Sequence, residues 1–121
     1  MPSQETLDAF VAHVISGDHV GAIERYYTDD ASMQENNDPP RVGRDVLMAS
    51  EAKVLARVER VTTELKAPVL VDGDQVAIRW RFEFFPKEGP SRIIEEVAWQ
   101  TWRGDKIARE TFFYDPRQMT A

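Results

Sequence analysis

The apolar residues of this 121-residue sequence change their spacing near residue 60. Before that point they recur every three or four residues, as Leu7, Phe10 and Val14 do, which is the spacing of a helix face. After it they alternate with polar residues, as in Val76–Phe84, which is the spacing of a strand with one buried face. Helices that precede an antiparallel series of strands predict an α+β fold, with the helices packed on one face of a sheet.

Cap and turn residues delimit three predicted helices. Ser3 can cap the first helix, and Gly17 suits the left-handed position that follows its end. Asp18 can cap a second helix over residues 19–27, and a third helix is predicted over residues 44–60.

The remaining segments have the character of strands and turns. Residues 36–40 include two consecutive prolines and are predicted to form a loop. Asp72-Gly73-Asp74 is a strong hairpin signal, and Gly104-Asp105 is a second tight turn. The predicted strands cover residues 31–35, 61–71, 76–84, 93–103 and 106–114.

Charge and cysteine content exclude several classes of function. Lys and Arg number 15 against 21 Asp and Glu, so the chain lacks the basic surface that a nucleic acid needs. The absence of cysteine excludes a disulfide framework and a thiolate metal site. No apolar run approaches the roughly 20 residues that span a bilayer, and the first ten residues lack the charge pattern of a signal peptide. We therefore expect a single cytoplasmic domain over residues 1–121, with no nucleic-acid or membrane partner.

Several short motifs occur along the chain in a recognisable order. They are Gly17-Asp18 followed by Tyr27, YTDDA at 27–31, RVGR at 41–44, WRGDKI at 102–107 and FFYDP at 112–116. Each motif is weak alone, but the ordered set resembles the nuclear-transport-factor-2-like (NTF2-like) superfamily, which contains the ketosteroid isomerases and the SnoaL-type polyketide cyclases. Such a resemblance is specific for a fold and poorly specific for an activity.

The resemblance implies a cone, in which a curved, mixed and mainly antiparallel sheet wraps around the N-terminal helices. A cavity opens between the helices and the concave face, and many members use it as an active site or binding site. Many members also form dimers through the outer face of the sheet. We therefore expect an apolar small molecule as ligand and a homodimer through the sheet face.

Matching the sequence to the ketosteroid-isomerase pattern gives a strand register for the cavity wall. This register turns six residues of the last two strands toward the cavity, and we expect them, together with Trp80, to bind the ligand: Glu96, Gln100, Trp102, Glu110, Phe112 and Tyr114. Apolar alternation also favours Trp80 and Phe82 as inward-facing. Alternatively, the aromatic residues fill the core and need no ligand. A slip of one residue would reverse every assignment.

The resemblance places Glu35 where the ketosteroid isomerases carry their general-base carboxylate. A carboxylate under an apolar roof has its charged form disfavoured, which fits it for proton transfer near neutral pH. We therefore predict Glu35 as the catalytic residue. The alternative is a solvated side chain, because Glu35 leads directly into the polar loop at 36–40.

The sequence departs from both activities of the family it resembles. The two positions that hold the enolate oxygen in ketosteroid isomerases are Phe10 and Ala98 here, and neither side chain donates a hydrogen bond. The cyclases pair an aspartate with a histidine, but His13 and His19 both lie in the predicted helices, with His19 expected at the surface. Neither mechanism is carried over. No metal site and no cofactor are expected, because the histidines lack ligand spacing and there is no glycine-rich phosphate loop.

Glu96 and Glu110 offer a second carboxylate site. If both point inward from adjacent strands, they could share a proton, and the pKa of one would rise. The alternative is a set of cross-strand charge pairs on an exposed or dimer-facing surface, formed by Glu95, Glu96, Arg79, Arg81 and Arg109.

Three functions remain open from the sequence. The leading one is a carboxylate-based isomerase, cyclase or dehydratase that acts on an apolar substrate. The second is a binding protein that holds such a ligand without transforming it. The third is a dimeric accessory protein whose sheet face docks a partner.

Overall fold

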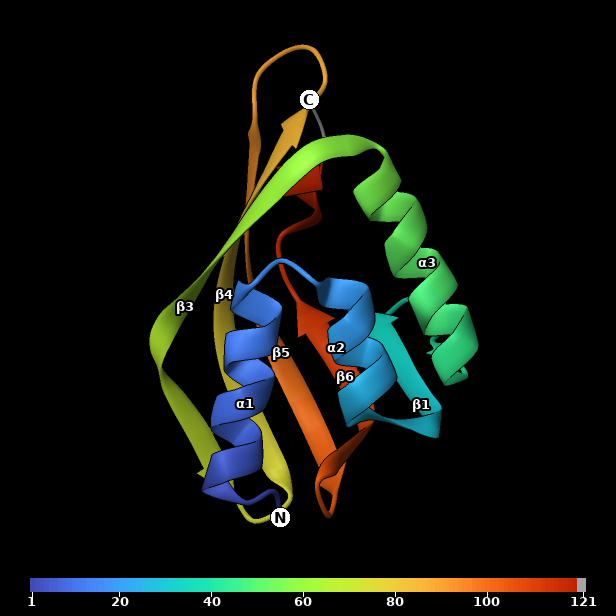
Figure 1. The fold of residues 1–121 in the computed structure, drawn as a ribbon, viewed down its shortest axis with the longest axis vertical. Coiled ribbons are helices and arrows are strands. Elements are labelled where there is room, and N and C mark those ends of the chain that lie inside the picture. Colours follow the sequence, from blue (N-terminus) through green and yellow to red (C-terminus); the bar gives the residue numbers. More distant parts are fainter. Residues whose placement is uncertain (120–121) are drawn as a thin grey trace.

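The computed structural model describes residues 1–119, so the last two residues of the predicted domain lie outside it. Three helices lie over one face of a bent sheet (Figure 1). The helices are α1 (Gln4–Ile15), α2 (His19–Tyr26) and α3 (Arg44–Ala56), with a 3-10 turn, η1, at Pro116–Met119. The strands are β1 (Tyr27–Glu35), β2 (Arg41–Val42), β3 (Val58–Asp72), β4 (Gln75–Pro86), β5 (Arg92–Arg103) and β6 (Lys106–Phe113). The predicted α+β fold is confirmed.

The first two helices begin and end as their cap residues predict. The hydroxyl of Ser3 accepts a hydrogen bond from the Thr6 N–H at 3.0 Å. The carboxylate of Asp18 does the same for the Gly21 N–H at 3.0 Å. Gly17, between the helices, has a φ of 92°, a conformation that favours glycine.

The sheet is mixed, with the strand order β2-β1-β6-β5-β4-β3. Neighbouring strands are antiparallel except for β1 and β6, which run parallel. That parallel pairing inserts the last strand beside the first, and it brings Glu35 opposite Phe112. The inward register is as predicted, since Trp80, Phe82 and Ala98 are buried. Trp99, on the opposite face of β5, remains 48 % exposed.

Two boundaries and one short strand differ most from the prediction. The third helix ends at Ala56 instead of continuing to residue 60, because Val58 and Val61 pair with β4. Strand β1 begins at Tyr27 rather than residue 31, because Tyr27 already pairs with Ile107 of β6. The short strand β2 was not predicted. In all three places, long-range pairing overrides local spacing.

No helix among residues 1–119 is long and apolar enough to cross a bilayer.

Candidate functional site

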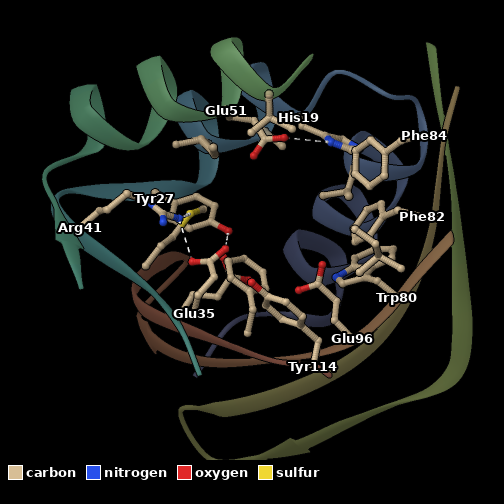
Figure 2. Close-up of a pocket in the computed structure, with 18 of the residues that line it drawn as sticks. His19, Tyr27, Glu35, Arg41, Glu51, Trp80, Phe82, Phe84, Glu96 and Tyr114 are labelled. Carbon is tan, nitrogen blue, oxygen red and sulfur yellow. Dashed lines mark hydrogen bonds and ion pairs between the residues drawn. The ribbon is translucent and has the colours of Figure 1, made fainter. Parts of the chain in front are cut away.

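A cavity of about 180 Å³ lies between the helices and the concave face of the sheet. Figure 2 shows His19 and Glu51 reaching into it from the helices, while Trp80 and Glu96 face it from the sheet. Most of its wall is hydrocarbon; the apolar side chains include Phe10, Val14, Ile23, Met33, Trp80, Phe82, Phe84, Ile94 and Phe112. Such a wall holds a ligand by burial and ring contacts, while the few polar groups fix its orientation.

Most of the residues predicted for the site line this cavity. They are Glu35, Trp80, Glu96, Glu110, Phe112 and Tyr114. Gln100 and Trp102 face the same side of the sheet but lie behind the wall, with exposed fractions of 0 % and 2 %. The ring of Phe10 packs edge-on against Trp102 at 5.7 Å and fills the space above it. Gln100 and Trp102 therefore support the wall rather than form its surface.

Glu35 ends β1 beside a cation that the sequence analysis did not place there. The Nη2 atom of Arg41, on β2, lies 3.0 Å from Oε2 of Glu35. The Glu35 side chain is 29 % exposed, so it lies neither in bulk water nor under a closed apolar roof. The positive charge of Arg41 offsets that of Glu35 at one end of the cavity (Figure 2), in an ion pair that leaves Oε2 of Glu35 and Nε of Arg41 without a hydrogen bond among the described residues.

Of the carboxylates that line the cavity, Glu96 is the one whose side chain has no partner among residues 1–119. It lies on β5 opposite Trp80, and no hydrogen bond or ion pair to its side chain is formed within residues 1–119. Burial raises the pKa of Glu96 to about 8, and the nearby negative charges of Glu110, Glu35 and Glu51 add to the effect. At neutral pH this side chain is therefore mostly protonated and able to donate a proton.

The alternative of cross-strand charge pairs does not apply to Glu96. Arg81 pairs across the strand with Glu95 on the outer face, and its guanidinium lies 3.9 Å from Glu64 and from Glu83. Glu96, one residue further along β5, faces the cavity instead.

Glu110 is held in a buried chain of hydrogen bonds. The Tyr27 hydroxyl donates to Oε1 of Glu110. Nε2 of Gln100 donates to Oε2 at 2.7 Å, and the indole N–H of Trp102 donates to Oε1 of Gln100 at 2.9 Å. Burial raises the pKa of Glu110 to about 7, against the opposing effect of the two hydrogen bonds. Because Glu110 is registered with Gln100 and not with Glu96, no hydrogen bond joins the two carboxylates.

Besides Arg41, the sequence did not reveal that His19, Glu51 and Tyr27 belong to the site. His19 was expected at the surface, but it is only 9 % exposed, with Nε2 3.0 Å from Thr63 Oγ1 and Nδ1 3.5 Å from Glu51 Oε1. Strand β3 covers this end of α2, which the expectation did not include. The spacing of His19, Ile23 and Tyr26 on one helix face is the signal that could have found it.

Tyr27 was also missed, since the sequence names it only as part of a family motif. It is 3 % exposed, lines the cavity, and contributes its hydroxyl to Glu110. Local sequence gives no sign of this contact, because its partner lies 83 residues away. Within the described residues, no group of three or more His, Cys, Asp or Glu side chains is arranged to hold a metal ion.

Comparison with known proteins identifies the fold family of this cavity. The sequence profile of the SnoaL-like domain matches residues 7–110. The chain belongs to the SnoaL-like family. The NTF2-like resemblance inferred from the motifs is thereby confirmed. No curated protein is detectably similar to the chain.

Solved structures share the SnoaL-like fold over nearly the whole chain. A candidate SnoaL-like polyketide cyclase from Mesorhizobium loti is 29 % identical, covers 91 % of this chain and 97 % of its own, and superposes with a TM-score of 0.75. A ketosteroid-isomerase-like protein from Catenulispora acidiphila, in complex with trimethylamine, is 19 % identical over 93 % of this chain and 87 % of its own (TM-score 0.76). TerC, co-crystallised with polyporic acid, is 16 % identical over 95 % and 92 % (TM-score 0.78).

Proposed function

We propose that this SnoaL-like protein is an enzyme that moves a proton on a small, mostly apolar molecule bound in the cavity. The carrying observation is Glu96, a carboxylate without a partner that faces an otherwise largely apolar wall. Its pKa of about 8 keeps it protonated at neutral pH, as a general acid requires.

Glu35 is the proposed base. Arg41 neutralises its charge and holds it at the cavity rim, 3.0 Å away. Two carboxylates on one cavity wall with different surroundings are suited to opposite roles, one giving and one accepting a proton. Isomerisation, cyclisation and dehydration can all use such a pair, because each moves protons on the substrate.

The size of the cavity limits the substrate. Its volume of about 180 Å³ is below the roughly 300–1,000 Å³ of pockets for drug-sized ligands. A molecule of one or two rings fits this space better than a steroid. The co-crystal of TerC with polyporic acid and the complex of the Catenulispora protein with trimethylamine support the use of this fold for small ligands.

Hydrogen–deuterium exchange tests the proposal without knowledge of the natural substrate. Small cyclic ketones are incubated in D₂O with the protein, and exchange next to the carbonyl is followed by NMR. We expect exchange above the buffer rate, and a loss of about 100-fold or more in E96Q and E35Q. E95Q, on the outer face of the same strand, is the matched control and should retain the rate. No exchange above buffer, or an equal loss in E95Q, would refute the enzyme.

The non-catalytic alternative has its own outcome in this experiment. Ketones that bind the cavity and yet exchange no faster than in buffer would identify a binding protein.

The homodimer expected from the resemblance is a second proposal. Trp99 and Phe113 are each 48 % exposed on the outer face of adjacent strands β5 and β6. Such an apolar patch away from the cavity is suited to a second copy of the chain. A monomeric mass by sedimentation at micromolar concentration would refute this dimer.

A further inference from the structure

The donor and acceptor in each hydrogen bond of one buried chain follow from the chemistry of its side chains. The chain consists of Trp102, Gln100, Glu110 and Tyr27. An indole N–H can only donate, so Trp102 requires the oxygen of the Gln100 amide to face it. The nitrogen of that amide then faces Glu110 and can only donate to Oε2, at 2.7 Å. Oε2 of Glu110 is therefore committed as an acceptor.

The hydrogen bond that Oε2 accepts from Gln100 determines which oxygen of Glu110 can carry a proton. That proton can only be on Oε1, the oxygen that contacts the Tyr27 hydroxyl. When Glu110 is ionised, Tyr27 must donate its hydrogen to Oε1. When Glu110 is protonated, Oε1–H donates to the tyrosine oxygen, and the tyrosine hydrogen turns to another acceptor.

The cavity is where that acceptor would be. Tyr27 lines the cavity, and no side chain within residues 1–119 other than Glu110 forms a hydrogen bond with its hydroxyl. The freed hydrogen therefore has a bound ligand as its available partner.

We propose that Tyr27 is the hydrogen-bond donor to a carbonyl oxygen of the ligand, with Glu110 behind it as the positioning residue that supplies the proton. This inference rests on the proposed function and adds a ligand class: ketones of one or two rings. As charge develops on the ligand oxygen, the Tyr27 O–H bond breaks and an O–H bond to the ligand forms. The Glu110 proton replaces the one that Tyr27 has given. Glu110 ends as a carboxylate that accepts from Tyr27 and Gln100, so one proton has moved and no electrons are gained or lost.

The charged groups around Glu110 determine when this donor is present. Glu35 from β1 and Glu51 from α3 place negative charge near it, whereas Glu96 from β5 is mostly protonated at neutral pH and becomes charged only as the pH rises through about 8. Arg41 and His19, the basic side chains of the cavity wall, lie against Glu35 and Glu51. Burial and the surrounding acids give Glu110 a pKa of about 7. The donor is therefore present below pH 7 and is lost as the pH rises through that value.

Two probes of nearly equal shape test the donor. Acetophenone has a carbonyl oxygen, and α-methylstyrene has a CH₂ group in its place. Binding is followed by the fluorescence of Trp80, which lines the cavity, from about pH 5.5 to 8.5. We expect acetophenone to bind roughly five- to ten-fold more tightly below pH 7 than above it, the worth of one hydrogen bond. α-Methylstyrene should show no such dependence.

Variants separate this role from a merely structural one. In E110Q the new amide can accept from Gln100 and donate to the Tyr27 oxygen, which holds the tyrosine hydrogen toward the cavity at every pH. E110Q should thus bind acetophenone tightly and lose the pH dependence, whereas Y27F should bind it weakly throughout. E95Q, on the outer face of β5, should keep the dependence, because the Tyr27–Glu110 contact is intact and no group of the cavity is changed.

The outcomes distinguish this inference from the function on which it rests. Equal, pH-independent binding of both probes would overturn the Tyr27 donor and leave the cavity as a ligand site. Binding of neither probe to the folded protein would overturn both. Ultraviolet resonance Raman of Tyr27, taken as the difference between wild type and Y27F, reads the donor state without ligand. A spectrum that does not change between pH 6 and 8 would also overturn the inference.

Discussion

Replacing Glu96 by glutamine should stabilise the protein at high pH and not at low pH. In the unfolded chain Glu96 ionises near its ordinary pKa of 4.5, whereas in the fold its pKa is about 8. Below the first value both states bind the proton and the residue has no pH-dependent effect. Between the two values the unfolded state gains stability by ionising and the fold does not, so the free energy of unfolding falls as pH rises. Above about 8 the loss is complete.

The magnitude follows from the two pKa values. One pKa unit corresponds to about 1.4 kcal/mol, so the difference between 4.5 and about 8 sets an upper limit of about 5 kcal/mol. The cavity admits water beside the carboxylate, which lowers the realised value, and we expect E96Q to gain about 2–5 kcal/mol over wild type at pH 9. At pH 4 the two should agree within about 0.5 kcal/mol.

Urea unfolding of wild type, E96Q and E95Q at both pH values measures this difference. Glu95 is exposed on the same strand, so E95Q controls for the loss of one negative charge and should change stability by less than about 0.5 kcal/mol. An E96Q profile that is parallel to that of E95Q from pH 4 to 9 would show that Glu96 is not desolvated in the fold.

Three further outcomes are expected from the structure. W102F should lose about 2–4 kcal/mol of unfolding free energy, because it leaves the buried Gln100 oxygen unpaired and opens space beside Phe10. The control W99F, at an exposed tryptophan, should lose less than about 1 kcal/mol. S3A should cost about 1 kcal/mol by removing the cap of α1, measured by urea unfolding against wild type; an unchanged midpoint would contradict that role. W99E should convert a dimer to a monomer in sedimentation, and a retained dimer would place the interface elsewhere.

The parts of the fold that local sequence determines could be predicted. Ser3, Gly17 and Asp18 fix the limits of the first two helices through contacts within a few residues. Alternation along β4 gives its inward face because a strand has only two faces to choose from. The end of α3 could not be predicted in this way, because pairing of Val58 with β4 decides it.

For the candidate site, the sequence predicts which face of the sheet each side chain points to, but not how deeply that side chain is buried. Strand register shows that Gln100 and Glu96 point to the same side, but Gln100 is fully buried while Glu96 meets the cavity. The difference arises from what lies above each side chain, and α1 supplies that through Phe10. Likewise, the pairing of Glu35 with Arg41 depends on β2, a strand too short to leave a pattern.

The parallel contact between β1 and β6 determines when the Tyr27–Glu110 hydrogen bond can form during folding. Tyr27 and Glu110 are 83 residues apart, so the contact between them closes a loop that includes α3 and strands β2 to β5. Closing so long a loop is among the slow steps of folding. A chain that lacks β6 therefore has the helices and part of the sheet but no Tyr27–Glu110 hydrogen bond, on which the proposed donor depends.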